Sequence, residues 1–385
     1  ANLLRRAAAL LPAYDQDRLD LLVDLGEALM DVGEFSEAGG VLRQAIAAGN
    51  DTGDHRLRAD ASLVLTLVEF YADPPPDWSQ RAARIASGAI PVFELMGDDA
   101  GLAKAWRVLG AVHANALRYG QAAQAVARAT EHARAAGDLR QERRNASSFA
   151  VAAVYGPTPV PEAIEECSRI VADATGDRRT EGLVLGALAH LEAMRGEFDR
   201  ARELSARARS TLEELGNSVL AVSTSLEAGA VELLAGNPAE AERLIRSDVS
   251  ELERMGAAYL LSTTTALLAQ AVAAQGRDAE AAELVEAGLR VTGDDDVESA
   301  VLLACVRSGL LVRAGDAAAG IVEARRATAL LDGADAPVTR AEALLALAEA
   351  CEAGGDAGAA AAARERAASE CRAKGYLVAV ERAAR

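Results

Sequence analysis

Apolar and polar positions along the chain follow the period of an α-helix. Between residues 196 and 216, apolar side chains recur at intervals of three and four residues and most other positions are charged; the apolar set is Phe198, Ala201, Leu204, Ala208, Leu212 and Leu215. This spacing predicts an amphipathic helix that buries one face. No segment of the sequence shows the period of two that is typical of a strand. We therefore expect an all-α protein.

The helical segments are separated by two interleaved series of breaks, each with a spacing of about 40 residues. One series comprises Gly33, Asp73, Leu117, Gly156, Gly196, Gly236, Gly276, Gly315 and Gly355. The other falls midway, at Gly53, Gly97, Gly137, Gly176, Gly216, Gly256, Gly293, Gly333 and Gly375. A glycine ends a helix with a left-handed residue, and the Asp or Asn that often follows caps the next helix. We expect about nine helix hairpins in a single array over residues 1–385, with corners at the first series and no internal domain boundary.

The hairpins resemble the tetratricopeptide repeat (TPR). That family has Leu-Gly in its first helix, Gly at the corner, an aromatic residue two positions later and small residues in the second helix. Residues 25–45 provide Leu25, Gly26, Gly33, Phe35, Ala38 and Ala45, and residues 188–208 provide Leu188, Ala189, Gly196, Phe198, Ala201 and Ala208. The later repeats keep the corner Gly and lose the aromatic residue. The resemblance implies a right-handed superhelical solenoid.

A repeat of about 40 residues, longer than the usual TPR, is similar to the repeats of bacterial signal-transduction ATPases of the STAND type. This resemblance implies a parent protein with an adenylate/guanylate cyclase or similar output domain and an ATPase module before the array, or with a LuxR-type DNA-binding module at its end. The sequence does not begin with Met, and Ala1 and Ala8 fit the second helix of a repeat. We therefore expect the chain to be a fragment of a longer protein.

Charge and composition exclude several classes of function. The net charge is −18, so a nucleic-acid backbone would be repelled. Aromatic residues make up only 3% of the chain against 51% apolar residues, which predicts a core of Ala, Leu and Val. Residues 255–276 carry one charge-free run, but its Thr, Ser and Gln side chains favour a buried helix over a membrane span. We expect a cytoplasmic protein.

Motifs for catalysis or for a cofactor are absent from the sequence. A P-loop requires a lysine after its second glycine, and neither Lys104 nor Lys374 has that setting. The four cysteines stand singly, which is typical of small buried residues, and the histidines fall in different repeats. The run Asp294 to Asp296 is either a loop with a helix cap or a weak cation site. We expect no catalytic residue, no metal and no cofactor.

The groove of the solenoid is the remaining place for a site, because first helices line the concave face of such arrays. Projecting the usual groove positions onto the chain gives Asp20, Glu27, Lys104, Arg107, Asn115, Asn145, Ser148, His190 and Gln270. Lys104 and Arg107 lie one helical turn apart in an acidic protein. They either contact solvent or form salt bridges between repeats, or they form a small basic spot that anchors a carboxylate of a peptide or ligand.

The corner "DPPPDW" at residues 73–78 contains three prolines, which predict a stiff, extended connection. Trp78 either packs on the next hairpin or marks a contact surface.

These observations favour a non-catalytic module that senses a signal. Its partner would be a protein or peptide, the ATPase domain of the parent protein, or a small effector. Two alternatives remain: an all-helical enzyme with an α/α-barrel, which requires a closed ring of helices, and a structural or oligomerisation spacer.

Overall fold

The computed structural model describes residues 1–174, 176–215 and 218–384, without the side chains of residues 218–223. The described residues form 20 α-helices and no strand, which confirms the all-α prediction. The even-numbered helices are α2 (Gln16–Asp31), α4 (His55–Ala72), α6 (Asp99–Asn115), α8 (Leu139–Tyr155), α10 (Arg178–Met194), α12 (Ser218–Leu234), α14 (Ala258–Ala274), α16 (Val297–Arg313), α18 (Pro337–Ala353) and α20 (Leu377–Ala383). The odd-numbered helices are α1 (Asn2–Leu10), α3 (Phe35–Thr52), α5 (Trp78–Met96), α7 (Tyr119–Ala135), α9 (Val160–Asp173), α11 (Phe198–Glu214), α13 (Pro238–Met255), α15 (Asp278–Val291), α17 (Ala317–Leu330) and α19 (Ala357–Lys374).

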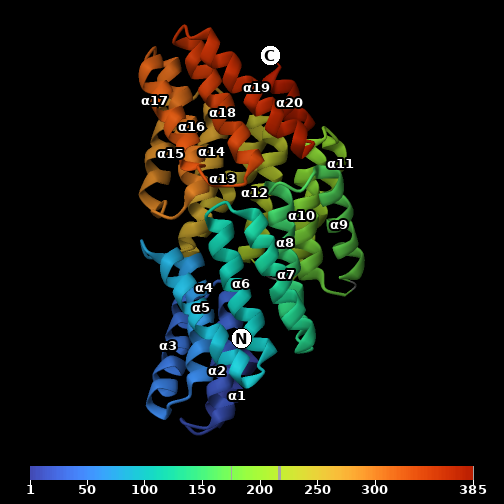
Figure 1. Ribbon diagram of the computed structural model, residues 1–385, viewed down its shortest axis with the longest axis vertical. Helices are drawn as coiled ribbons and strands as arrows, with labels where there is room; N and C mark the ends of the chain where they lie inside the picture. Colours follow the sequence, from blue (N-terminus) through green and yellow to red (C-terminus); the bar gives the residue numbers. More distant parts are fainter. Residues whose placement is uncertain (175, 216–217, 385) are drawn as a thin grey trace.

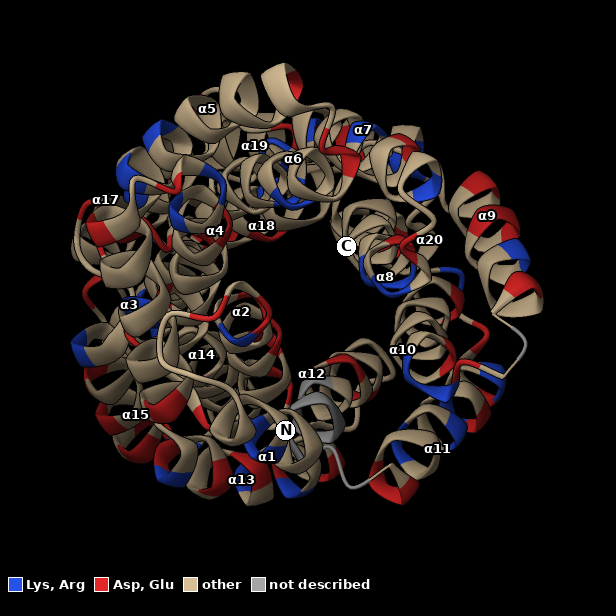
Figure 2. Cartoon of the chain, turned by 90° about the horizontal axis from the view of Figure 1, so that it is seen from below, with Lys and Arg blue, Asp and Glu red and all other residues tan. Residues whose placement is uncertain are grey.

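The helices form two concentric layers. Successive even-numbered helices from α2 to α18 pack against one another, and each also packs against its odd-numbered neighbours in the chain. Viewed along the superhelix axis, the even-numbered helices form the inner layer and the odd-numbered helices form the outer layer (Figure 2). The first helix of each hairpin therefore faces the axis, as the TPR resemblance implies.

Local sequence explains where most of the inner helices begin. Asp54, Asp98 and Asp138 each accept a hydrogen bond from the backbone N–H three residues later, at 2.9, 3.0 and 3.0 Å. These carboxylates satisfy N–H groups that have no partner inside the helix and lie at its positive end. The predicted capping by the residue after each break glycine is thus confirmed for α4, α6 and α8.

Two corners depart from the simple glycine pattern. Leu117 has a φ of 53° and is the one non-glycine residue with positive φ in the described part of the chain. Its side chain is buried, so packing offsets the backbone strain. Gly156 was expected to be left-handed, but its backbone is extended, with φ −83° and ψ −175°. A Cβ at Gly156 would lie 2.5 Å from the Ala152 carbonyl oxygen of α8 and 2.7 Å from the Cβ of Tyr119, so both the end of α8 and the close approach of the preceding hairpin favour glycine there.

Hairpins are held together by small residues on inner helices. A Cβ added at Gly26 of α2 would lie 2.6 Å from atoms of Leu42 on α3, and Leu42 is completely buried. The Leu-Gly pair of the repeat pattern therefore allows an outer-helix leucine to approach the inner helix closely. On the outer helix α3 the small residues Ala38 and Ala45 are fully buried as well.

The hairpins wind into a right-handed superhelix whose turns stack (Figure 1). Helix α4 packs against α14, α8 against α18, and α10 against α20. Each pair is ten helices apart, so one turn takes about five hairpins. The N-terminal helices lie at one end of the long axis and the C-terminal helices at the other. The helices therefore form a spiral and not the closed ring that the α/α-barrel alternative requires.

The two turns of the superhelix meet where hairpin corners of the first turn contact the connections between hairpins of the second turn. The Asp335 carboxylate accepts hydrogen bonds from the backbone N–H groups of Tyr119 and Gly120, the latter at 2.8 Å. The Lys374 ammonium is buried and donates to the carbonyl oxygens of Ala153 and Thr158 at 2.7 and 2.6 Å. These bonds join residues more than 200 positions apart in the sequence.

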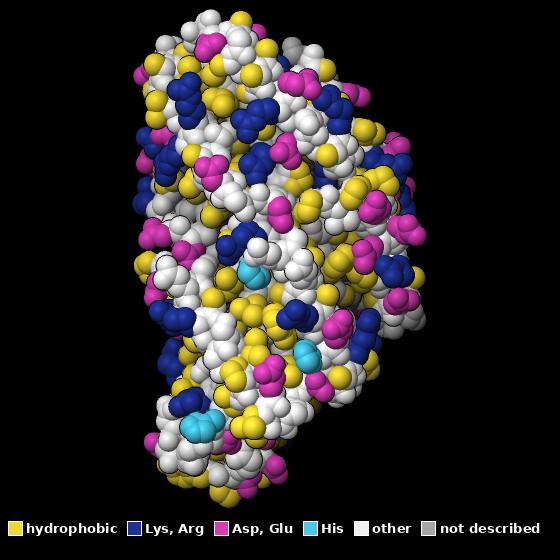
Figure 3. All heavy atoms as spheres, in the orientation of Figure 1, with side chains coloured by type: hydrophobic (Ala, Val, Ile, Leu, Met, Phe, Trp, Pro, Cys, Tyr) yellow, Lys and Arg dark blue, Asp and Glu magenta, His cyan; other side chains and the backbone are white. Residues whose placement is uncertain are grey.

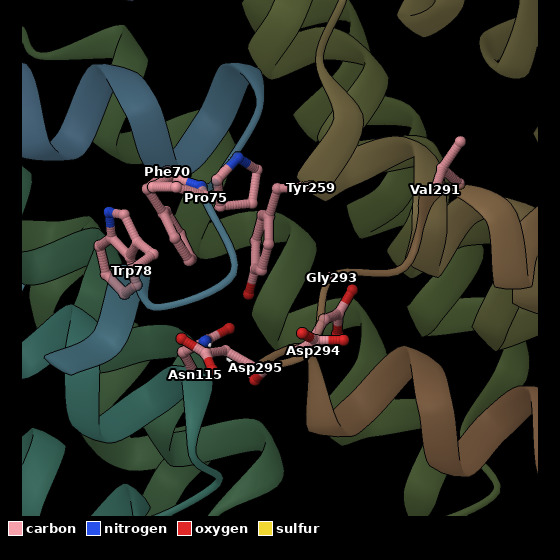
Figure 4. Close-up of a pocket in the computed structure, with 11 residues that line it drawn as sticks. Phe70, Pro75, Trp78, Asn115, Tyr259, Val291, Gly293, Asp294 and Asp295 are labelled. Atoms are coloured by element: carbon pink, nitrogen blue, oxygen red, sulfur yellow. Dashed lines mark hydrogen bonds between the residues drawn. The ribbon is translucent and has the colours of Figure 1, made fainter. Parts of the chain in front are cut away.

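The proline-rich corner forms another joint between the turns. Trp78 is 1% exposed and its indole N–H donates to the Thr66 carbonyl at 2.8 Å, so this residue packs in the core. The ring of Phe70 lies between Trp78 and Tyr259, with centroids 4.4 and 4.0 Å apart (Figure 4). Around these rings is a cavity of about 10 Å³, which has room for one water molecule at most.

The aspartate run at residues 294–296 belongs to the same joint. The Asp295 carboxylate accepts from the N–H of Ser79 at 2.8 Å, and Asp296 caps α16 through the N–H of Ser299 at 3.1 Å. Two of the three aspartates thus have structural roles, in agreement with the loop-and-cap interpretation.

Charges of both signs are interspersed over the face shown in Figure 3. None of the helices in the described residues is long and apolar enough to cross a membrane.

Candidate functional site

Charged side chains and one glutamine from five inner helices meet on the inner wall of the first turn. We call this set the charge cluster; it consists of Glu27 and Asp31 on α2, Asp60 on α4, Lys104 and Arg107 on α6, Arg140, Gln141 and Arg144 on α8, and Arg179 on α10. Five helices, α3 to α7, separate α2 from α8 in the chain. The curvature of the superhelix therefore brings these residues together.

Glu27 is the centre of the charge cluster. Its Oε2 lies 2.5 Å from Arg144 Nη1, and its Oε1 lies 3.1 Å from Gln141 Nε2 and 3.8 Å from Lys104 Nζ. Burial opposes ionisation of this carboxyl group, but Lys104 and Arg144 outweigh burial and lower the pKa of Glu27 to about 2. Glu27 is therefore a buried carboxylate held by cations of two other helices.

Two further carboxylates, Asp60 and Asp31, extend the cluster. Lys104 Nζ donates to Asp60 Oδ1 at 2.7 Å, which links α6 to α4. Asp31 accepts from Arg144 at 2.5 Å and from Arg179 at 3.3 Å, which links α2 to α8 and α10. Burial disfavours the charge of Asp31, yet Arg144 and Arg179 lower its pKa below the ordinary value.

Arg107 is the least paired cation of the charge cluster: it forms no ion pair among the described residues, whereas Arg144 and Arg179 are ion-paired and leave only their Nε without a partner. Its Nε and one terminal nitrogen are buried and find no hydrogen-bond partner among the described residues. Burial and the neighbouring charge of Arg144 lower the pKa of Arg107 to about 10, so its surroundings disfavour a positive charge. Asn145, on the same face of α8 as Gln141, is fully buried, and neither its amide nitrogen nor its oxygen has a partner in the described part of the chain.

Unpaired buried polar groups are informative because each costs free energy in the ligand-free protein. Arg107 and Asn145 carry such groups on α6 and α8, two inner helices that pack against each other.

A second polar set lies further along the inner wall. We call it the tyrosine–carboxylate cluster; it consists of Tyr119 on α7, Tyr155 on α8, His190 on α10, Glu227 on α12 and Glu298 on α16. Tyr155 Oη donates to Glu227 Oε1 at 3.2 Å, and His190 Nδ1 lies 2.5 Å from Glu227 Oε2. The rings of Tyr119 and Tyr155 are stacked with centroids 6.2 Å apart.

Glu298 differs from Glu27 in its environment. Burial, Asp296 and Glu227 together raise the pKa of Glu298 to about 7, and its hydrogen-bond donor is the Tyr119 hydroxyl at 3.4 Å. No lysine or arginine of the described residues forms an ion pair with Glu298. Near neutral pH this carboxyl group is therefore partly protonated.

The groove positions named from the sequence fall in several places. Glu27, Lys104 and Arg107 belong to the charge cluster with Asn145 beside them, and His190 belongs to the tyrosine–carboxylate cluster. The other four positions lie outside both clusters. Asp20 forms an ion pair with Arg56, and Asn115 donates a hydrogen bond to the Asp295 carbonyl at the joint between turns. Ser148 is exposed on α8, and Gln270 is partly exposed on α14. Lys104 forms the salt bridges of the first interpretation, whereas Arg107 forms none among the described residues.

Sequence reasoning missed most of the partners in both clusters. Arg144 and Gln141 of α8, and Tyr155 and Glu298 further on, were not named. For α8 a signal existed, since Gln141, Arg144, Asn145 and Ser148 follow helical spacing on one face. For Glu298 no signal existed, because its position depends on the stacking of turns.

Among the described residues no group of three or more His, Cys, Asp or Glu side chains could hold a metal ion. Burial raises the pKa of Cys167 and Cys371 to about 12, so their thiolates are disfavoured.

Comparison with solved structures identifies the fold. A Rap protein complexed with Competence and Sporulation Factor superposes with a TM-score of 0.68 at 14% identity, over 94% of this chain and 98% of that chain. The Rap conjugation gene regulator of plasmid pLS20 in complex with the Phr* peptide has a TM-score of 0.59 at 12% identity, over 92% and 97%. Aspartyl phosphate phosphatase F from Bacillus subtilis has a TM-score of 0.52 at 12% identity, over 92% and 94%.

The sequence matches no family model and no curated protein. At these identities the structural likeness concerns the fold. The chain is thus similar to TPR-like helical-repeat proteins over nearly its whole length, and its fold is that of a TPR-like superhelical solenoid.

Proposed function

We propose that this chain is a non-catalytic sensor module that binds a peptide or a segment of a partner protein on its inner wall. The observation that carries the proposal is the incomplete pairing of Arg107 and Asn145 where five inner helices converge. An anionic group of the ligand would supply the missing hydrogen bonds, and an arginine fork suits a carboxylate.

The fold supports a peptide ligand. Two of the similar structures are complexes, one with Competence and Sporulation Factor and one with the Phr* peptide. Solenoids present extended concave surfaces that fit such chains. For the parent protein we propose a bacterial STAND-type regulator, with the array as a single unit over residues 1–385, and with its ATPase domain or a small effector as further binding partners.

A peptide array tests the proposal. The purified chain is applied to an array of random octapeptides, and the spots it retains are measured again with Arg107→Gln and with Arg243→Gln, which lies on the outer helix α13 and is exposed. We expect Arg107→Gln to weaken the retained spots at least tenfold and Arg243→Gln to leave them unchanged. Retention that responds to neither substitution, or only to Arg243→Gln, would overturn the inner-wall site.

Activity assays test the non-catalytic part of the proposal. Hydrolysis of ATP and acetyl phosphate and formation of cyclic nucleotides are measured with the same chain. We expect rates equal to the buffer blank. Turnover that disappears on substitution of a single residue of either cluster would show that the chain is an enzyme.

A further inference from the structure

We propose that Glu27 of α2 acts as an internal competitor, occupying the basic inner wall in the ligand-free chain until an acidic peptide displaces it. This inference rests on the proposed function and adds a mechanism by which binding changes the conformation of the chain.

The charge balance of the inner wall supports the first step. Five cations, namely Lys104, Arg107, Arg140, Arg144 and Arg179, face four carboxylates, namely Glu27, Asp31, Asp60 and the exposed Asp24. This local excess of positive charge occurs in a chain whose net charge is −18. The cations are therefore concentrated at this place, and carboxylates of the chain itself neutralise most of them.

The geometry of Glu27 supports the second step. A single carboxylate from α2 has Arg144 at 2.5 Å, Gln141 at 3.1 Å, and Lys104 and Arg140 at 3.8 Å. Its side chain is 2% exposed, and its oxygens occupy the position that a ligand carboxylate would take among these donors. Arg107 is the cation of the cluster that has no ion pair among the described residues, and two of its nitrogens are unpaired.

The packing of α2 supports the third step. Helix α2 packs on α1, α3 and α4, and Glu27 and Asp31 are the side chains that tie it to α8 and α10 across the inner wall. A ligand with several carboxylates can replace both of these and also satisfy Arg107. Release of Glu27 and Asp31 then loosens α2 from α8, which converts binding into movement of the first hairpins.

Peptide affinity is the first test. Fluorescence anisotropy measures the binding of fluorescein-labelled hexaglutamate to the full chain, with hexaglutamine of equal length as the probe without charge. We expect Glu27→Gln to raise the affinity for hexaglutamate about tenfold, because an internal competitor is removed. Glu240→Gln on the outer helix α13 makes the same change in net charge and should leave the affinity unchanged. An equal rise in both variants would overturn the proposal, because it would reflect net charge alone.

Two further variants keep the test decisive if Glu27→Gln folds poorly. Glu27→Asp keeps the negative charge but shortens the side chain by one methylene, which moves the carboxylate away from the cations. We expect a smaller gain in affinity for hexaglutamate than with Glu27→Gln. Adding Arg107→Gln to Glu27→Gln should abolish the gain. Affinity that is unchanged or lower in Glu27→Asp, with the helical content of wild type, would overturn the proposal.

Movement of α2 is the second test. Hydrogen exchange of residues 16–31 is measured in the wild-type chain with and without saturating hexaglutamate. We expect faster exchange in α2 on binding, although ligands usually slow exchange. Slower exchange in α2 would show that Glu27 stays in place, and it would overturn the proposal. Inorganic phosphate and acetate are added as competitors, and displacement by phosphate alone would overturn the carboxylate assignment.

The two proposals fail in different ways. If hexaglutamate does not bind while array peptides bind in an Arg107-dependent manner, the internal competitor is wrong and the sensor function stands. If no peptide depends on Arg107, both proposals are wrong.

Discussion

The charge cluster lies within one turn of the superhelix, whereas the tyrosine–carboxylate cluster lies where two turns meet. Glu27 and Arg144 come from α2 and α8 of the first turn. Tyr119 of α7 and Glu298 of α16 are 179 residues apart in the sequence. The first cluster therefore depends on the curvature of one turn, and the second depends on how the turns stack.

The clusters also place carboxylates in opposite electrostatic settings. Cations surround Glu27 and lower its pKa to about 2, whereas burial beside Asp296 and Glu227 raises the pKa of Glu298 to about 7. Two glutamates on one inner wall thus differ in whether folding favours or disfavours their charge. The comparison shows that the sign of the neighbouring charges, and not burial alone, decides the protonation state.

The largest effect is expected from removing a cation of the charge cluster. The side chain of Arg144 is 3% exposed, and Arg144→Met leaves Glu27 and Asp31 without their shortest partner. Breaking such a buried pair costs about 3–5 kcal/mol, which urea denaturation followed by circular dichroism will measure. Arg243→Met removes an exposed pair with Glu240 and should leave the midpoint unchanged. Equal midpoint shifts in the two variants would mean that the buried charge cluster contributes no more to the free energy of unfolding than an exposed ion pair does.

The next effect is a dependence of stability on pH. The pKa of Glu298 is about 7 in the folded chain and 4.5 is its ordinary value, so the folded state keeps a proton that the unfolded state has lost in this interval. Stability should therefore fall as pH rises from about 4.5 to 7, by on the order of 2 kcal/mol. Glu298→Gln should remove this slope in urea titrations at several pH values. A slope that persists in the variant would assign it to other groups.

The charge cluster should respond to pH in the opposite direction. The pKa of Glu27 in the folded chain is about 2, so its contribution is present above about pH 4.5 and is lost as the pH falls toward 2. Unfolding measured between pH 2 and 4.5 should show a steeper loss of stability for wild type than for Glu27→Gln. A parallel loss in the two proteins would contradict the ion pairs described for Glu27.

A smaller effect is expected from Asp335→Ala, which breaks the joint beside Tyr119. Two backbone N–H groups of residues 119 and 120 lose their acceptor, at a cost of about 1–2 kcal/mol. Hydrogen exchange of these two amides should accelerate. Asp356→Ala, which removes the cap of α19 at Ala359, serves as the control and should accelerate exchange only at the start of α19. Unchanged exchange at residues 119 and 120 would show that stacking of the turns does not depend on Asp335.

The smallest effect is expected from Tyr119→Phe. The hydroxyl of Tyr119 lies 3.4 Å from Glu298, which is long for a hydrogen bond, so its loss should cost about 0.5 kcal/mol or less. The free energy of unfolding at pH 5 and pH 8 measures this difference. A cost as large as that of Arg144→Met would mean that the hydroxyl, and not charge repulsion, governs the tyrosine–carboxylate cluster.

Features that depend on a few neighbouring residues could be predicted from the sequence. Helical spacing located the hairpins, and Asp54, Asp98 and Asp138 cap the inner helices after their break glycines as expected. Gly156 is an exception, because it ends α8 with an extended backbone, where a Cβ would collide with Ala152 of that helix and with Tyr119 of the preceding hairpin. The sequence also indicated which helix of each hairpin faces the axis, and so placed Glu27, Lys104 and His190 on the inner wall.

Only the tertiary structure decided which of these side chains meet. Arg144 reaches Glu27 over 117 residues of sequence, and Asp335 meets Tyr119 over 216 residues. Each hairpin is rotated slightly relative to the one before it, and the sum of these rotations sets both the closeness of α2 to α8 and the register between turns. No short pattern of residues encodes that sum. The repeat and its capped helices are local properties of the sequence, whereas the two inner-wall clusters result from rotation accumulated over many repeats.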